Sequence, residues 1–315
     1  MNSNLILRVT FIAACVIAAS GCWTSPKSQS PEGPVNYRNE RVNFSNTNVK
    51  DLVNSNKAMN SNREDDGSKK DGFAANLPSG FEQPTDDVGR MLLREYGSVF
   101  VARDGVTPPA KVVFRDQGEV SSLQSGLMTS AATIGGFRLE LQAPAMDALQ
   151  TAIVQARAKG LDISPRGADS AKRTYDETVG LWKSRVDPAL VHWVGKGKLT
   201  KDDADRIKGM STFDQVKEVL RLEGQGIYFA KDLSKSIIYS VAPPGTSQHL
   251  SLLAFDVKEF DNAEVRRILN ENGWFQTVAS DLPHFTYLGV KESELSGLGL
   301  KKVTSSGRTF WVPDV

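Results

Sequence analysis

Apolar residues recur at intervals of three and four along five stretches of the chain, which is the spacing of one face of an α-helix. In the second stretch the stripe runs through Met146, Leu149, Ile153 and Ala156. Glycine follows several of these stripes, where the left-handed backbone of a helix end favours it. The spacing predicts helices that begin near residues 86, 146, 174, 212 and 261. At the third of these, Thr174 and Glu177 fit a capping box.

Short runs of β-branched, aromatic and other apolar residues separate the predicted helices. They predict strands at residues 99–102, 112–114, 161–163, 227–230, 237–241, 252–257 and 310–312. Helices and strands alternate irregularly, without the repeated βαβ order of a parallel sheet. The pattern therefore favours an α+β fold, in which helices flank a central antiparallel sheet.

Composition divides the chain into four parts. Residues 1–21 have the form of a signal peptide, with Arg8 before an apolar run. Residues 22–80 are rich in Asn, Ser, Lys and Asp, and their apolar residues are isolated, which predicts a disordered tether. Residues 81–136 are expected to form a small N-terminal subdomain without evident chemistry, and residues 137–315 a catalytic domain.

The two cysteines lie at or before the end of the signal segment. Ala19, Ser20 and Gly21 precede Cys22, and this order resembles the bacterial lipobox, whose cysteine is lipidated and becomes the first mature residue. The resemblance implies an exported protein that is lipid-anchored to the bacterial cell envelope, in the periplasm or on the cell surface. The alternative is an ordinary secretory signal with an incidental cysteine. Because Cys15 would be removed, the mature domain has no disulfide or thiolate ligand.

The charge of the chain says little about its partner. The chain has 38 Lys and Arg against 37 Asp and Glu, and removal of Arg8 leaves 37 against 37. A balanced surface argues against nucleic acid as the partner. It does not exclude a peptide or a glycan polymer, and no pattern in the sequence indicates the oligomeric state.

Two of the three histidines lie near acidic residues. A catalytic zinc ion takes three protein ligands, and a domain without thiols would supply two imidazoles and one carboxylate. His249, Asp256 and His284 are the candidates. Fully extended, the seven residues from His249 to Asp256 would span about 23 Å, so the chain must bend between them. Asp256 interrupts an apolar run, where a carboxylate is costly unless it is paired or metal-bound.

Asp281 lies three residues before His284, so a single turn places both on one side. A carboxylate in that position can take the proton of a zinc-bound water, whose pKa the metal lowers to about 7. The sequence thus predicts a zinc site at the sheet edge, with Asp281 as the candidate general base.

Residues 242–256 resemble the first signature of the zinc D-alanyl-D-alanine carboxypeptidases, the family of VanY-like peptidoglycan peptidases. That signature reads A-x-P-G-x-S-x-H-x-x-G-x-A-x-D, and the chain departs from it only at Leu252, in place of glycine. Residues 281–289 are similar to the second signature, an acid three positions before a histidine. Residues 173–178 are similar to a third element, Arg-Ser-Tyr-x-x-Gln. Over residues 140–290 the three follow the family's order.

The resemblance implies a role for each matching residue. His249, Asp256 and His284 would bind one zinc ion per chain, and Asp281 would be the general base. Arg173 would hold the substrate near its scissile carbonyl or terminal carboxylate, and Ser247 would orient the site by hydrogen bonding. The implied reaction is hydrolysis of the terminal D-Ala-D-Ala bond of peptidoglycan stem peptides.

The chain departs from the family's pattern at further positions. Pro283 stands where tryptophan is frequent, Thr178 replaces glutamine, and Asp281 replaces the commoner glutamate. None of these changes removes a predicted ligand. Two alternatives to a carboxypeptidase remain: a peptidoglycan endopeptidase of the same fold, or a catalytically inactive lipoprotein that binds the cell wall.

Overall fold

The computed structural model describes residues 72–315. The predicted signal peptide, the lipidation site Cys22 and residues 22–71 of the predicted tether lie outside the described residues. Among residues 72–315, no helix combines the length and the apolar character needed to cross a membrane.

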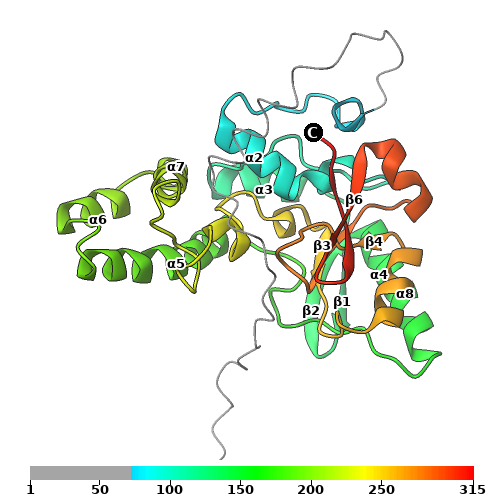
Figure 1. Ribbon diagram of the computed structural model, residues 1–315. Coiled ribbons are helices and arrows are strands. Elements are labelled where there is room, and N and C mark those ends of the chain that lie inside the picture. Colours follow the sequence, from blue (N-terminus) through cyan, green and yellow to red (C-terminus); the bar gives the residue numbers. More distant parts are fainter. Residues whose placement is uncertain (1–71) are drawn as a thin grey trace, which may run out of the picture. The chain divides into compact units, whose positions relative to one another are not determined.

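Helices and strands alternate irregularly along this part of the chain (Figure 1). In order they are η1 (Phe73–Asn76), α2 (Asp87–Tyr96), η2 (Gly97–Val101), α3 (Gln117–Ser125), β1 (Thr129–Ile134), β2 (Phe137–Gln142), α4 (Ala143–Arg157), α5 (Tyr175–Gly195), α6 (Lys201–Lys208), α7 (Thr212–Glu223), η3 (Ile237–Tyr239), η4 (Gln248–Ser251), β3 (Ala254–Asp256), α8 (Ala263–Glu271), β4 (Trp274–Phe275), β5 (His284–Tyr287), η5 (Glu292–Leu298), β6 (Leu300–Ser305) and β7 (Arg308–Pro313), where η denotes a 3-10 helix.

The strands form antiparallel sheets, which confirms the α+β class. The central sheet has the order β3-β5-β4, and two hairpins, β1-β2 and β6-β7, complete the strands of the described region. Helix α8 packs against β4 and α4 against α8, so helices flank this sheet (Figure 1). Residues 164–170 lie along the outer edge of β3 and accept two backbone hydrogen bonds there. Asp256 N donates to Ser170 O at 2.9 Å, and Lys258 N donates to Ser164 O at 2.8 Å.

Helix α5 begins at the predicted capping box. The Thr174 hydroxyl accepts from Glu177 N at 3.2 Å, and the Glu177 carboxylate accepts from Thr174 N at 2.7 Å. Two N–H groups that the helix cannot satisfy itself are thus paired, which stabilises a helix start by about 1 kcal/mol. The capping box also fixes the position of Arg173, which immediately precedes it.

Helices α6 and α7 lie along α5, away from the central sheet (Figure 1). Trp182 of α5 is fully buried, and its indole N–H donates to Gln215 of α7 at 2.9 Å. The Gln215 amide in turn donates to the carbonyl of Ile207 in α6 at 2.9 Å. One buried polar chain therefore ties the three helices together, in addition to their apolar contacts.

Several predicted strands are wrong. Residues 99–101 and 237–239 are 3-10 helices, and residues 112–114, 161–163 and 227–230 belong to no strand. All five stretches contribute buried side chains, because a short apolar run marks burial without specifying the backbone. The pattern at 252–257 predicts its strand correctly only over β3, and the final strand at 310–312 lies within β7.

Ordered structure begins before residue 86, the start that the helical pattern indicates. Phe73 is buried, and a Cβ atom built at Gly299 would lie 2.0 Å from Phe73 N. This contact across the chain cannot be read from the local polar composition. Leu92 and Val99, from the predicted N-terminal subdomain, belong to the same apolar core as Phe255 of β3.

Candidate metal centre

Three buried side chains converge at one end of the central sheet. His249 comes from η4, Asp256 ends β3 and His284 begins β5. One ligand atom from each residue lies within 4.8 Å of the others, and their exposed fractions are 1%, 8% and 4%. The structure thus brings together the three residues that the sequence suggested as metal ligands, in a group that could hold a metal ion.

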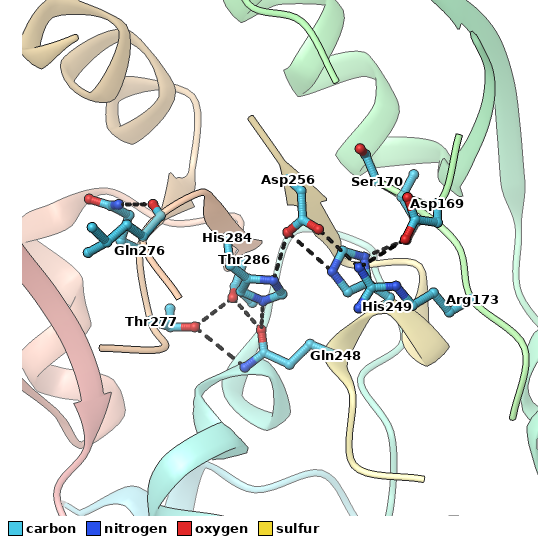
Figure 2. Close-up of polar contacts among 12 residues, drawn as sticks. Asp169, Ser170, Arg173, Gln248, His249, Asp256, Gln276, Thr277, His284 and Thr286 are labelled. Carbon is cyan, nitrogen blue, oxygen red and sulfur yellow. Dashed lines mark hydrogen bonds and ion pairs between the residues drawn. The ribbon is translucent and has the colours of Figure 1, made fainter. Parts of the chain in front are cut away.

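Asp256 stands between the two imidazole rings (Figure 2). Its Oδ1 lies 3.2 Å from His284 Nδ1 and 3.3 Å from His249 Nε2. The rings meet nearly edge to face, with centroids 4.9 Å apart. His249 Nε2 is buried and makes no hydrogen bond within residues 72–315, since its contact with Asp256 has the distance of an ion pair but not the direction of a hydrogen bond.

In each imidazole ring, the nitrogen that does not face Asp256 contacts an oxygen atom. His249 Nδ1 lies 3.2 Å from the carbonyl oxygen of Ala171, and His284 Nε2 lies 2.9 Å from Oε1 of Gln248. A carbonyl oxygen only accepts hydrogen bonds, so each of these nitrogens carries a proton. In a neutral imidazole the other nitrogen then bears a lone pair.

These tautomers test whether the residues fit a metal. With both rings neutral, two nitrogen lone pairs and the Asp256 carboxylate share one small buried space. The carboxylate oxygen lies 3.2 Å and 3.3 Å from the two ring nitrogens, so it and their lone pairs repel one another unless a cation or an added proton lies among them. A divalent metal satisfies all three donors, and the contacts to Ala171 and Gln248 are the second-shell bonds that orient ligating imidazoles. The donor set, two nitrogens and one carboxylate oxygen, suits zinc.

The electrostatics of the group favour an ionised carboxylate beside a neutral ring. Burial opposes ionisation of Asp256, but the attraction of His249 and His284 outweighs it and holds the Asp256 pKa well below its usual value. Burial lowers the pKa of His249, which favours its neutral, metal-binding form. The nearby positive charge of Arg173 acts in the same direction on His249.

A tight turn and a short 3-10 helix position His249. The turn closes through Thr246 N to Pro243 O at 3.0 Å. Gly245 has φ +79°, and a Cβ atom there would lie 1.9 Å from the carbonyl oxygen of Phe114, so only glycine fits. Leu252, which stands where the related signature has glycine, also has positive φ, at +58°. The signature's glycine thus matches a backbone requirement, which Leu252 meets with its side chain fully buried.

Arg173 contacts the outer oxygen of Asp256. Its Nη2 lies 3.1 Å from Asp256 Oδ2 and 3.5 Å from Asp169 Oδ2 (Figure 2). The Arg173 side chain is mostly buried, and its Nε has no hydrogen-bond partner within residues 72–315. The guanidinium therefore orients Asp256 and adds a positive charge at the border of the metal group.

Asp281 lies in the turn that leads into β5. Its N–H donates to Val278 O at 3.0 Å and its carbonyl accepts from His284 N at 3.2 Å. Asp281 is exposed to solvent, unlike the three candidate ligands. The protein around its carboxyl group reduces hydration and so raises the pKa of Asp281, and the negative charge of Asp256 raises it further. The carboxylate is thus within electrostatic range of the metal group without belonging to it.

Two further residues that the sequence comparison singled out have defined contacts. Ser247 is buried, and its side chain makes no capping hydrogen bond to η4, which it precedes. Thr178, in place of glutamine, accepts from Gly245 N at 3.3 Å and so supports the turn before His249. Gln248 and the carbonyl of Ala171 escaped the sequence analysis, because neither residue type indicates a role without the contact that the fold creates.

The sequence matches no protein-family model and no curated protein. It is similar to solved structures over about half its length. A vancomycin-resistance D,D-pentapeptidase VanY, an alanine mutant in complex with Zn(II), is 18% identical over 53% of this chain and 81% of its own, with a TM-score of 0.31. VanYB in complex with D-alanine-D-alanine is 18% identical over 51% and 77%, with a TM-score of 0.29. The LdcB LD-carboxypeptidase is 17% identical over 50% of this chain and 64% of its own, with a TM-score of 0.29. A likeness of this extent carries no conclusion about activity, which depends on the residues of the site.

Proposed function

We propose that this protein is a zinc metallopeptidase that hydrolyses the terminal D-Ala-D-Ala bond of peptidoglycan stem peptides. The observation that carries the proposal is the convergence of two imidazole lone pairs and one carboxylate oxygen in a buried group. The substrate class comes from the sequence resemblance, in which these three residues occupy the ligand positions of the zinc D-alanyl-D-alanine carboxypeptidases, in the same order.

His249 Nε2, Asp256 Oδ1 and His284 Nδ1 would hold the metal. When bound, zinc acts as a Lewis acid toward the scissile carbonyl and lowers the pKa of water. Asp281 would take a proton from the attacking water on its carboxylate and pass that proton to the leaving amine of the terminal D-Ala. Its raised pKa suits this task, because a base is most effective when its pKa approaches the working pH.

Arg173 would stabilise negative charge on the substrate. A guanidinium offers directed N–H donors to the developing charge on the carbonyl oxygen or to the terminal carboxylate. The contacts with Asp256 and Asp169 use Nη2, and Nε has no partner within residues 72–315, so the guanidinium keeps N–H donors beyond those two contacts, which supports this role. Ser247 would add a hydrogen bond to bound substrate, and its hydroxyl is not used to cap η4.

The same proposal places the protein in the cell envelope, anchored through a lipid on Cys22. The segment before Cys22 supports this location, as does the tether-like composition of residues 22–71. Mass spectrometry of the N-terminal peptide from the membrane fraction, compared with a Cys22→Ser variant, would test it. An unmodified Cys22 in the mature protein would contradict lipid anchoring and leave the proposed chemistry intact.

The decisive experiment measures metal and product together. We expect about one zinc per chain in the purified protein by elemental analysis, lost in His249→Ala. We also expect zinc-dependent release of D-Ala from a stem pentapeptide, abolished by a chelator and restored by zinc. Cleavage of cross-linked peptides without release of terminal D-Ala would instead indicate the endopeptidase alternative.

The inactive alternative predicts a different result. Its sequence basis is the departure from the signatures at Leu252 and Pro283, yet Leu252 adopts the positive φ that its position requires. Binding of cell-wall fragments without any metal-dependent product would favour the inactive lipoprotein. Failure to bind zinc, even after addition of the metal, would overturn the proposed function itself.

A further inference from the structure

Gln248 reaches from one candidate ligand to another. It directly precedes His249 in the chain, but its side chain lies against His284, with Oε1 at 2.9 Å from Nε2 (Figure 2). Gln248 is almost completely buried, so its amide must find all its partners within the protein. In this contact the amide presents its oxygen, and not its nitrogen, to the His284 ring.

The partner of the amide nitrogen fixes the orientation of the Gln248 amide. Gln248 Nε2 donates to the backbone carbonyl of Tyr96 at 2.8 Å. Because that carbonyl only accepts, the nitrogen must face Tyr96 and the oxygen must face His284. A rotation of the amide by 180° would bring two acceptor oxygens together in a buried space, a contact that costs a hydrogen bond and adds repulsion.

Two threonines make this orientation self-consistent. The Thr286 hydroxyl donates to Gln248 Oε1, and the Thr277 and Thr286 hydroxyls lie 2.6 Å apart. Since Thr286 has given its one proton to Gln248, Thr277 donates to Thr286, and the Thr277 oxygen accepts from Gln248 Nε2 at 3.4 Å. The three side chains form a closed cycle in which every donor has an acceptor, and the Tyr96 carbonyl sets its direction.

We infer that Gln248 is a positioning residue that holds His284 in its metal-binding tautomer. With Oε1 as acceptor, His284 keeps its proton on Nε2 and directs the Nδ1 lone pair at Asp256 and the metal position. With the amide reversed, the proton would move to Nδ1 and block the site. The role at the metal rests on the proposed zinc site, but the tautomer is a property of the protein without metal.

A matched pair of variants separates this role from a purely structural one. Gln248→Met and Gln248→Glu both remove the donor to Tyr96, and glutamate also sets a second acceptor oxygen against that carbonyl, so glutamate should lose at least as much stability as methionine. Only glutamate keeps an oxygen that accepts from His284. We expect zinc affinity to fall about 10- to 100-fold in Gln248→Met, the range for loss of a second-shell partner, and to stay within a few-fold of wild type in Gln248→Glu.

The tautomer itself is measurable by nitrogen-15 NMR of the metal-free protein, since the chain contains only three histidines. We expect the Nε2–H form of His284 in wild type and Gln248→Glu, and a mixture of forms in Gln248→Met. Thr277→Val, which breaks the cycle without touching His284, should keep the wild-type tautomer. Equal zinc affinities and tautomers in the methionine and glutamate variants would overturn the inference. If wild type binds no zinc, the proposed function fails, while the tautomers still decide the role of Gln248.

Discussion

Asp256 and His284 are direct cross-strand partners in the antiparallel ladder of β3 and β5. Their facing side chains bring Oδ1 and Nδ1 to 3.2 Å, although 27 residues separate them in the chain. A slip of one residue in this register would turn one of the two side chains to the opposite face of the sheet. The strand pairing is therefore what assembles two of the three candidate ligands.

Replacing Asp256 by asparagine should abolish tight zinc binding. The amide keeps the size of the carboxylate but removes its charge, and it leaves the Arg173 guanidinium beside two imidazoles without its main partner. We expect zinc affinity to fall by at least about 100-fold, beyond the usual effect of a second-shell change. Competition with a chromophoric chelator measures this affinity.

Asp169→Asn is the matched control for this substitution. Asp169 also contacts Arg173, but at 3.5 Å and with 60% of its side chain exposed. Its removal should leave zinc affinity within a few-fold of wild type. Equal losses in the two variants would mean that Arg173 neutralisation, and not ligation by Asp256, governs the metal.

Asp281→Asn should separate catalysis from metal binding. The three candidate ligands remain in place, so the variant should keep about one zinc per chain. Loss of the proposed base should lower kcat by about 10²- to 10⁴-fold. Asp281→Glu, which introduces the residue commoner in the family that the sequence resembles, should keep more activity than the asparagine variant. Full activity in Asp281→Asn would remove this residue from the mechanism.

The sequence identifies three residues that the fold brings together, whereas it mispredicts several of the surrounding strands. His249, Asp256 and His284 could be chosen because the chain has few histidines and because Asp256 interrupts an apolar run. The bend expected between His249 and Asp256 is present as η4 and the left-handed residue Leu252. These features follow from residue type and local spacing, which a sequence shows directly.

What the sequence could not show depends on pairing between distant segments. The β3–β5 register, the carbonyl of Ala171 beside His249 and the amide of Gln248 beside His284 exist only in the folded chain. The five mispredicted strands fail for the same reason, since the backbone conformation of a short apolar run, unlike its burial, is decided by its tertiary neighbours. Local patterns thus identify candidate ligands, while long-range contacts determine their orientation.

Gly245→Ala should destabilise the fold far more than Gly226→Ala. Both glycines have a left-handed backbone, with φ +79° and +83°, so both variants incur strain of about 1–2 kcal/mol. A Cβ atom at position 245 would also lie 1.9 Å from the Phe114 carbonyl oxygen, whereas nothing lies within 4 Å at position 226. We expect a loss of about 3 kcal/mol or more at 245, from strain and overpacking together.

Urea denaturation, followed by tryptophan fluorescence, measures both losses in free energy of unfolding. Zinc affinity should fall in Gly245→Ala and not in Gly226→Ala, since only Gly245 belongs to the turn that leads to His249. Similar stabilities of the two alanine variants would show that the turn can move away from Phe114.

Glu223 should make the stability of the fold depend on pH. This last residue of α7 is 1% exposed and accepts from Phe229 N at 3.1 Å, Ile237 N at 2.7 Å and the Ser236 hydroxyl. Burial raises its pKa to about 7, although the hydrogen bonds oppose the shift. The folded state then binds the proton more tightly than the unfolded chain does, so stability falls as pH rises from about 4.5 to about 7 and is level above.

Glu223→Gln should remove this pH dependence. The amide oxygen can still accept from the two backbone N–H groups, and its nitrogen can donate to Ser236, so the loop after α7 keeps its bonds. A shift from about 4.5 to about 7 corresponds to at most about 3 kcal/mol. We therefore expect the free energy of unfolding of wild type to fall by up to that amount relative to Glu223→Gln between these pH values. Parallel pH profiles of the two proteins would show that Glu223 ionises in the folded state as readily as in the unfolded chain.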